Sequence, residues 1–147
     1  MKQTKLFPNG KLPELPVSDE LKYLWAPWRM GYIRTVKNEF GPCLFCDKSQ
    51  IGKDEDDLVV HRGENAYILM NLYPYNNGHL MVVPYDHEKN FDDLQTDTQV
   101  EMMNLMSQAM GVLRESLSAD GFNFGANFGE VAGAGIKEHL HLHLVPR

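Results

Sequence analysis

The stretch HLHLHLVPR, residues 139–147, carries the strongest structural signal in this chain. Histidine and leucine alternate strictly over its first six residues, and a period of two is typical of a β-strand, whose successive side chains point to opposite faces. We expect His139, His141 and His143 to share one face of a strand, with the leucines buried on the other. Residues two apart on a strand lie about 6.5–7 Å apart, so the strand would present a row of three imidazoles.

The ordinary explanation of such a row is polar side chains on the solvated face of a strand. It fits poorly here, because imidazole is a weak strand former and neighbouring imidazoles repel one another once protonated. An affinity tag fits no better, because tags are not interleaved with leucine. The row instead favours chemistry, since imidazole serves as a nucleophile, a general acid or base, or a metal ligand.

The composition is that of one globular domain. The chain has 147 residues, 43% of them hydrophobic and 23% charged, and no run approaches the roughly 18 apolar residues that a membrane span needs. The basic residues after Met1 are not followed by an apolar run, so we expect no signal peptide and a cytoplasmic protein. The net charge of −6 argues against a general nucleic-acid binder and requires that local donors hold an anionic substrate.

The N-terminal part divides into an arm and an aromatic segment. Residues 1–20 contain three prolines and little periodicity, so we interpret them as an extended arm. Residues 21–33 hold both tryptophans and two tyrosines. A hydrophobic flap packed on the core is the ordinary interpretation of that segment, and a base-stacking or dimer-packing surface built from Trp25, Trp28 and Tyr32 is the alternative.

Three further segments, 57–61, 65–71 and 79–84, have the composition of strands. The last two are predicted to form a hairpin, because residues 72–78 between them have turn chemistry and close on Asn77-Gly78.

A long helix is predicted to follow, beginning with a capping box formed by Thr96 and Gln99 and ending at residues 119–121. Its apolar residues step by three or four, and they are Val100, Met103, Met106, Met110, Leu113 and Leu117. A stripe packed on the core is the plain interpretation, and a flexible methionine-rich binding face is the alternative. A strand at 122–127 and a loop at 128–137 come next, and the loop's three glycines would let main-chain N–H groups reach phosphate oxygens.

Cys43 and Cys46 form a Cys-x-x-Cys pair, which is typical of a redox motif or a zinc site and also arises by chance. A redox motif would need a following helix, whereas residues 47–53 are polar and soon interrupted by a glycine. Zinc would need two more ligands, and histidines outside the centre of the row could supply them.

The alternating motif at residues 139–145 resembles the signature of the histidine triad family of nucleotidyl hydrolases and transferases. The likeness extends over residues 21–147 and includes Asn71, the Gly78-His79 step, Asp86-His87 and the long helix. Residues 21–33 are similar to the branch that contains the diadenosine tetraphosphate phosphorylases. The resemblance implies an α+β fold, a five-stranded antiparallel sheet with one long helix and shorter helical segments packed on one face, and a homodimer.

The resemblance also implies roles for individual residues. His141 matches the family nucleophile, His143 the histidine that holds and neutralises the phosphate, and His79 a histidine beside the phosphate site. Asn71 matches a residue that binds the ribose hydroxyls, and Asn127 falls where an amide side chain lies near the phosphates.

One departure concerns the residues before the triad, where many family members have Gln-Ser or Gln-Thr. This chain has Gly135-Ile136-Lys137-Glu138 there. We therefore expect a backbone N–H of Gly135 or Ile136, or the Lys137 side chain, to take over the donor role.

A zinc site is implied as well. In family members with Cys-x-x-Cys, the cysteines are joined by a histidine after the hairpin and by the first histidine of the triad. Here these residues are Cys43, Cys46, His87 and His139, a Cys₂His₂ set typical of closed structural zinc sites.

Three functions remain open from the sequence. The first is an enzyme in which His141 attacks the α-phosphorus of a purine dinucleoside polyphosphate or nucleoside phosphoramidate through a covalent intermediate. The second is a nucleotide-binding or sensing module with little turnover. The third is a purely metal-handling protein, which would leave Asn71 and His143 without a task.

Overall fold

The computed structural model describes residues 43–147. The arm predicted at 1–20 and the aromatic segment at 21–33 lie outside the described residues. Within the described part, no helix is both long and apolar enough to cross a membrane.

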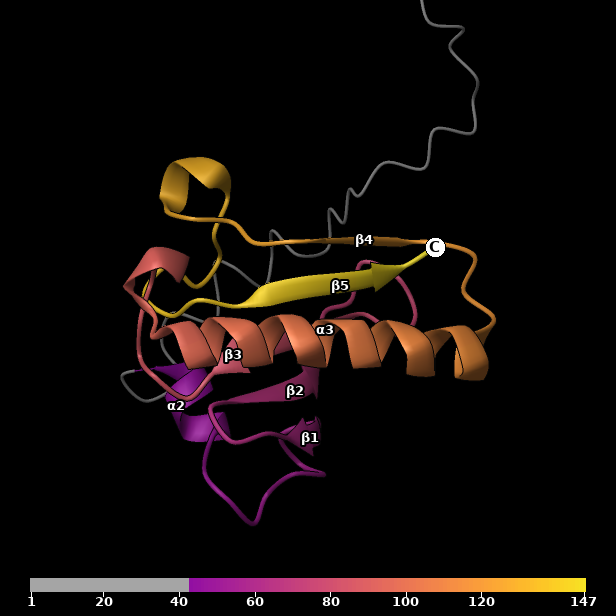
Figure 1. Ribbon diagram of the computed structural model, residues 1–147, viewed down its shortest axis with the longest axis horizontal. Helices are drawn as coiled ribbons and strands as arrows, with labels where there is room; N and C mark the ends of the chain where they lie inside the picture. Colours follow the sequence, from indigo (N-terminus) through magenta and orange to yellow (C-terminus); the bar gives the residue numbers. More distant parts are fainter. Residues whose placement is uncertain (1–42) are drawn as a thin grey trace, which may run out of the picture.

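One antiparallel sheet of five strands organises the described chain, as expected (Figure 1). The strands are β1 (Val59–Arg62), β2 (Ala66–Met70), β3 (Leu80–Pro84), β4 (Phe122–Gly125) and β5 (Leu142–Pro146). Their order across the sheet is β1-β2-β3-β5-β4, and the predicted hairpin is β2-β3. Strand β5 therefore lies between β3 and β4, which brings His143 opposite Met81 on one side and opposite Gly125 on the other.

The long helix α3 (Thr96–Leu117) crosses one face of the sheet (Figure 1). It contacts β2, β3 and β5. The buried residues of the helix are Thr98, Met102, Leu105, Met106, Ala109 and Leu113. Except for Thr98, these residues form the larger core with the apolar side chains of the sheet, which include Ala66, Ile68, Leu80, Val82, Leu142 and Leu144.

The predicted details of this helix are partly wrong. The buried stripe is rotated from the predicted one, so that Met106 and Leu113 are buried whereas Val100, Met103 and Leu117 are exposed. The cause is that Leu105 and Ala109 also face the sheet, and the small Ala109 carries little weight in a pattern of large apolar residues.

The predicted helix ends also need correction. The helix begins after Gln95, and the Gln99 amide donates to the carbonyl oxygens of Phe91 and Leu94 and so does not close a capping box with Thr96. At the other end Ser118 adopts the left-handed conformation, with φ 53° and ψ 40°, before the predicted stop at 119–121.

The opposite face of the sheet carries a second, smaller core. Tyr67, Leu69, Met81 and Val83 point to this side and pack with Phe45 of the short helix α2 (Leu44–Lys48). Alternation along β2 and β3 thus sends side chains to both cores, which explains why these strands are almost wholly apolar.

The triad segment differs from a uniform strand. The ladder of β5 begins at Leu142, so His139 and His141 precede it, and the N–H of Leu140 instead donates to the carbonyl oxygen of Glu88 at 2.7 Å. The leucines lie in the larger core as predicted, but His139 and His141 are themselves buried. The predicted strand that carries all three histidines is therefore wrong in its start, and only His143 lies within β5.

The connection between β4 and β5 is long, running from residue 126 to residue 141, and most of it is exposed. Two single turns of 3-10 helix, η2 (Phe91–Asp93) and η3 (Glu130–Ala132), lie in the loops before α3 and before the triad. Strand β4 ends the sheet order, and its Phe124 side chain is 54% exposed.

Candidate functional site

His79 and His143 form a hydrogen-bonded pair that the sheet brings together. His79 precedes β3 and His143 lies in the neighbouring β5, and His79 Nε2 is 2.9 Å from His143 Nδ1. The main-chain N–H of Tyr75 donates to His79 Nδ1 at 3.0 Å, so that nitrogen is an acceptor and the ring proton of neutral His79 lies on Nε2. His79 therefore donates to His143 Nδ1, and the neutral His143 ring carries its proton on Nε2.

His141 has the opposite tautomer. Its Nδ1 is 2.9 Å from the main-chain oxygen of His139, and a carbonyl oxygen only accepts, so the proton lies on Nδ1. The lone pair of neutral His141 is then on Nε2. The rings of His141 and His143 meet edge to face with their centroids 4.9 Å apart, and Phe45 packs on His141 at the same distance. Two adjacent rings thus carry their protons on different nitrogens.

Asn71 lies beside this pair, at the end of β2. Its side-chain oxygen accepts the N–H of Tyr73 at 2.9 Å, which starts the turn between β2 and β3. Its Nδ2 lies 3.5 Å from both ring nitrogens of His79. The structure therefore brings together four of the predicted site residues, His79, His141, His143 and Asn71.

The predicted residues of the glycine loop are arranged differently. Asn127 is exposed, and its amide donates within the loop to the Gly133 carbonyl oxygen at 3.4 Å. Gly135 is exposed as well, whereas Ile136 packs against the smaller core that contains Phe45. The Lys137 ammonium pairs with Glu130 at 3.4 Å in an exposed position, where such a pair adds little stability.

Four potential metal ligands cluster next to the histidines. Cys43, Cys46, His87 and His139 each offer one atom, and these atoms lie within 4.8 Å of one another. His139 Nδ1 is 3.2 Å from Cys43 Sγ and 3.6 Å from Cys46 Sγ, and His87 Nδ1 is 3.2 Å from Cys46 Sγ. The cluster could hold a metal ion, and its composition suits zinc.

The orientation of His139 fits this role. Its Nε2 is 2.9 Å from the carbonyl oxygen of Pro84, so Nε2 carries the proton and Nδ1 turns its lone pair toward the thiols. Burial lowers the pKa of His139, which keeps the ring neutral as a ligand must be. Burial, together with Cys43, raises the pKa of the Cys46 thiol to about 11.

The metal cluster is linked to His141 through His139. His139 points its ring into the cluster, and its carbonyl oxygen accepts the proton of His141 Nδ1. The cysteine segment is held in turn by Arg62, which donates to the carbonyl oxygens of Ser49 and Gln50 and to the carboxylate of Asp54. The hydrogen bond that fixes the tautomer of His141 therefore comes from a residue of the metal cluster.

Sequence reasoning missed three contributors to the site. Phe45 packs against both His139 and His141, Tyr75 stacks on His79, and Pro84 fixes the tautomer of His139 with its carbonyl oxygen. The aromatic residue in the turn was a usable signal, because a tyrosine is not needed for turn chemistry. A main-chain carbonyl leaves no signal in the sequence.

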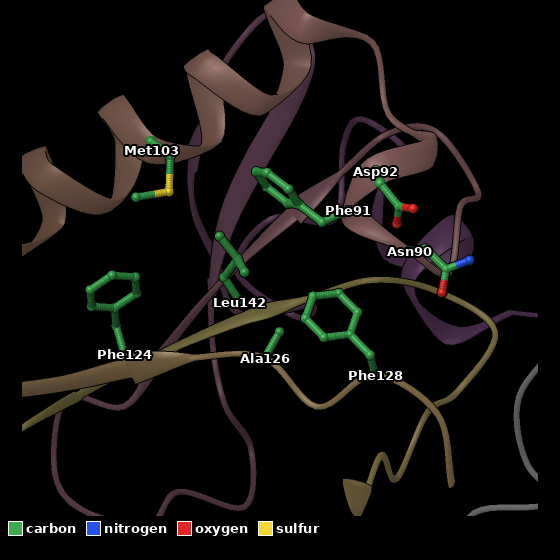
Figure 2. A pocket seen from close by; sticks show the side chains of 8 residues that line it. All are labelled: Asn90, Phe91, Asp92, Met103, Phe124, Ala126, Phe128 and Leu142. Carbon is green, nitrogen blue, oxygen red and sulfur yellow. The ribbon is translucent and has the colours of Figure 1, made fainter. Parts of the chain in front are cut away.

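A separate apolar groove of about 500 Å³ lies on the α3 side of the sheet, and no histidine of the described residues is among those that line it (Figure 2). Phe91, Phe124 and Phe128 border it, and Met103 and Leu142 lie between them (Figure 2). Asn90, Asp92 and Ala126 complete the lining.

Comparison with known proteins agrees with this arrangement. The HIT domain family model matches residues 53–147. An AP-4-A phosphorylase of Mycobacterium tuberculosis is 41% identical over 136 residues, which cover 88% of this chain and 69% of that protein. A bis(5'-adenosyl)-triphosphatase of Dictyostelium discoideum is 30% identical over 84 residues, 57% of this chain and 56% of the relative.

Among solved structures, a zinc-bound histidine triad family protein from Mycobacterium smegmatis superimposes with a TM-score of 0.61 at 29% identity, covering 72% of this chain and 75% of that one. The family match, the five-stranded sheet and the clustered histidines together show that the chain belongs to the histidine triad (HIT) family.

Proposed function

We propose that this protein cleaves purine nucleotides at the α-phosphorus by nucleotidyl transfer through His141, with dinucleoside polyphosphates or nucleoside phosphoramidates as substrates. The observation that carries the proposal is the opposite protonation of two neighbouring rings, with a lone pair on His141 Nε2 and a proton on His143 Nε2. The activities in the names of the two relatives, a phosphorylase and a triphosphatase, support the same class of substrate.

The reaction would proceed in two displacements. In the first, His141 Nε2 forms a bond to the α-phosphorus while the bond from that phosphorus to the leaving group breaks. A polyphosphate oxygen leaves as the anion with the bonding electrons, and a phosphoramidate nitrogen leaves as the neutral amine after taking a proton from water. In the second, water or inorganic phosphate attacks the phosphorus and the phosphorus–nitrogen bond breaks, which returns His141 to its starting state. Water releases a nucleoside monophosphate and phosphate releases a diphosphate. Two displacements split one difficult step into two easier ones.

The negative charge that develops on the phosphate oxygens needs hydrogen-bond donors close by. The chain as a whole does not supply a positive field, because its net charge is −6. The His143 Nε2–H is the proposed donor, and His79 supports it from behind through the 2.9 Å hydrogen bond. We assign the N–H groups of Gly135 and Ile136 and the Asn127 amide to the phosphates when the loop engages substrate.

Asn71 is proposed to bind the ribose. Its side-chain oxygen uses one lone pair in the turn, so a second lone pair is left to accept a hydrogen bond from a ribose hydroxyl.

We also propose that Cys43, Cys46, His87 and His139 hold one structural zinc ion. The donor set, the distances and the tautomer of His139 all suit it. When bound, zinc would tie the cysteine segment to the strand that carries the histidines and would take no part in the displacement.

The test is a panel of reactions with the parent protein and His141→Ala. Diadenosine polyphosphates and adenosine phosphoramidate are incubated with water alone or with inorganic phosphate, and the products are separated by chromatography. We expect turnover by the parent and a loss of at least about a thousandfold in His141→Ala, because the covalent route is removed. Equal rates in the two proteins would reject His141 as the nucleophile.

A nucleotide-binding module is the second candidate, and Asn71 favours it because ribose recognition needs no turnover. Calorimetry with a nucleoside monophosphate separates the two functions: a binding module would bind tightly and leave every substrate of the panel intact.

A homodimer and a cytoplasmic location complete the proposal. The exposed edge of β4 and the groove bordered by Phe124 and Phe128 support pairing with a second copy. The two thiols of the cluster suit a reducing compartment, where they stay available as ligands. Light scattering of the parent and of Phe124→Glu tests the dimer, and a parent of monomer mass would reject it.

A further inference from the structure

Tyr75 contacts the pair formed by His79 and His143 in two different ways. Its main-chain N–H donates to His79 Nδ1 at 3.0 Å. Its ring stacks on the His79 ring with centroids 5.1 Å apart and planes 16° apart, and it meets the edge of His143 at 6.3 Å. The same residue therefore supplies a hydrogen-bond donor to one nitrogen of His79 and an aromatic surface to the whole ring.

Neither contact is required by the turn itself. The turn between β2 and β3 is already held by the Asn71 side chain, which accepts the N–H of Tyr73, and by Gly78, whose φ of 75° suits the approach to His79. The Asn76 amide adds a bond to the Pro146 carbonyl oxygen at 2.9 Å. An aromatic ring at position 75 therefore needs an explanation beyond the turn.

Two other neighbours of His79 in the described part of the chain, Asn71 and His143, do not select its tautomer. Asn71 Nδ2 is 3.5 Å from both ring nitrogens, so it contacts the ring without preferring one of them. His143 Nδ1 can accept from His79 Nε2 or, in its other tautomer, donate to it. The Tyr75 amide is a donor only, and it fixes the direction of both hydrogen bonds.

We propose that Tyr75 is a positioning residue that sets the protonation of the catalytic histidine pair. Its ring holds the His79 ring in the plane where the amide reaches Nδ1, and His79 then places the proton of His143 on Nε2. This inference rests on the proposed function, because it explains how His143 comes to face the phosphate with an N–H.

The first experiment needs no substrate. Long-range proton–nitrogen correlation spectra of the uniformly ¹⁵N-labelled parent at pH 8 distinguish the two tautomers of each neutral imidazole. We expect His79 and His143 as Nε2–H tautomers and His141 as the Nδ1–H tautomer. An Nδ1–H tautomer at His79 would overturn the inference and would leave the covalent role of His141 untouched.

The second experiment uses Tyr75→Ala, which removes the ring and keeps the amide, and Tyr75→Phe, which keeps both. In Tyr75→Ala we expect mixed tautomers at His79 and a fall in kcat of roughly three- to tenfold, the size of one aromatic stacking contact, with KM little changed. Tyr75→Phe should recover the parental tautomers and most of the rate. Leu72→Ala, an exposed residue of the same turn, is the matched control.

Thermal unfolding of each variant shows whether it is folded before its rate is compared. A folded Tyr75→Ala with parental tautomers and rate would overturn the inference, as would a Tyr75→Phe that behaves like Tyr75→Ala. If the parent turns over no nucleotide, the proposed function fails, and the tautomers of the parent and of Tyr75→Ala still decide the role of Tyr75.

Discussion

The Nδ1 atom of His141 carries a proton, because it bonds the main-chain oxygen of His139. The Nδ1 atom of His143 carries none, because it accepts the proton of His79. Two residues of the same type, two positions apart, thus receive opposite roles from their hydrogen-bond partners. Alternation in the sequence predicts that the rings are neighbours. It does not predict the hydrogen-bond partners. The partner of His141 is a main-chain oxygen, and the partner of His143 is His79, which lies 64 residues away in the sequence.

The support that His79 gives to His143 can be tested at a single residue. His79→Phe keeps an aromatic ring in a fully buried position but removes the donor to His143 Nδ1. We expect kcat to fall about 10- to 100-fold, the value of one hydrogen bond to a group that becomes charged. Steady-state kinetics measure it, and a kcat within twofold of the parent would show that His79 is not needed.

Tyr67 provides a residue-scale test of the smaller core. Its hydroxyl is completely buried and donates to the Phe45 carbonyl oxygen at 2.8 Å, and burial raises the pKa of Tyr67, which keeps the hydroxyl a donor. Tyr67→Phe removes this donor while the Ser49 N–H still bonds the same oxygen at 3.0 Å, so we expect a loss of about 0.5–1.5 kcal/mol in the free energy of unfolding. Urea denaturation measures it, and an unchanged midpoint would contradict the assignment.

At the scale of elements, the sheet and its long helix were predictable and the helix face was not. Composition and turn residues predict β1, β2 and β3, and alternation predicts β4 and the triad strand. Strands β2 and β3 do not alternate, because both of their faces are buried. The helix stripe was rotated because Ala109 is buried while the larger Val100 and Met103 remain exposed. The size and hydrophobicity of residues do not reveal which positions of a helix must be small to pack closely against a sheet.

The turn before β3 offers an element-scale prediction. Gly78 has φ 75°, and a Cβ there would meet the Leu117 side chain, Pro146 Cγ at 3.1 Å and Leu113 Cδ2 at 3.2 Å. We expect Gly78→Ala to lower the free energy of unfolding by about 1–3 kcal/mol, through backbone strain and overpacking. Thermal or urea unfolding provides the measurement.

Gly111 is the matched control, because it lies inside α3 with nothing within 4 Å of an added Cβ. Gly111→Ala should stabilise the protein by about 0.5–1 kcal/mol through helix propensity. If both substitutions changed the free energy of unfolding in the same direction, the account of Gly78 would be wrong.

At the scale of the whole molecule, the sheet separates the apolar groove from the histidines and the metal cluster. The α3 face holds the larger core and the groove of Figure 2, and the other face holds Phe45, the histidines and the metal cluster. The cysteine pair in the sequence indicated a zinc site or a redox motif. Spacing alone does not identify the other two ligands, because His87 lies 41 residues from Cys46 and His139 lies 96 residues from Cys43. The family resemblance pointed to these two histidines, and the fold places them beside the thiols.

The metal centre predicts a link between zinc and stability. We expect about one zinc ion per chain in the parent, and a marked loss of zinc with a lower melting temperature in Cys43→Ser and in His87→Ala. The exposed His61 lies outside the cluster, so His61→Ala is the control and should keep its zinc. Elemental analysis measures the content, and full occupancy in both ligand variants would reject the site.

Binding of this zinc should also depend on pH in a defined direction. The pKa of Cys46 is raised to about 11, so its thiol is protonated in the metal-free protein at pH 7–8 and must lose that proton when it becomes a ligand. Zinc addition should therefore release protons, and the affinity should rise with pH over this range. Calorimetry in buffers of different ionisation enthalpy measures the release, and an affinity independent of pH would contradict it.

The central claim is that His141 becomes covalently attached to the nucleotide, and mass spectrometry of the protein during turnover tests it most directly. The reaction with a diadenosine polyphosphate is stopped within milliseconds at alkaline pH, because a phosphorus–nitrogen bond to histidine is labile in acid, and the protein is digested and sequenced. The account predicts one adenylyl group on the peptide that contains residues 139–147, located on His141, forming and decaying at least as fast as kcat and missing in His141→Gln. Turnover at the parental rate by His141→Gln, or an adenylyl group on another residue, would contradict it.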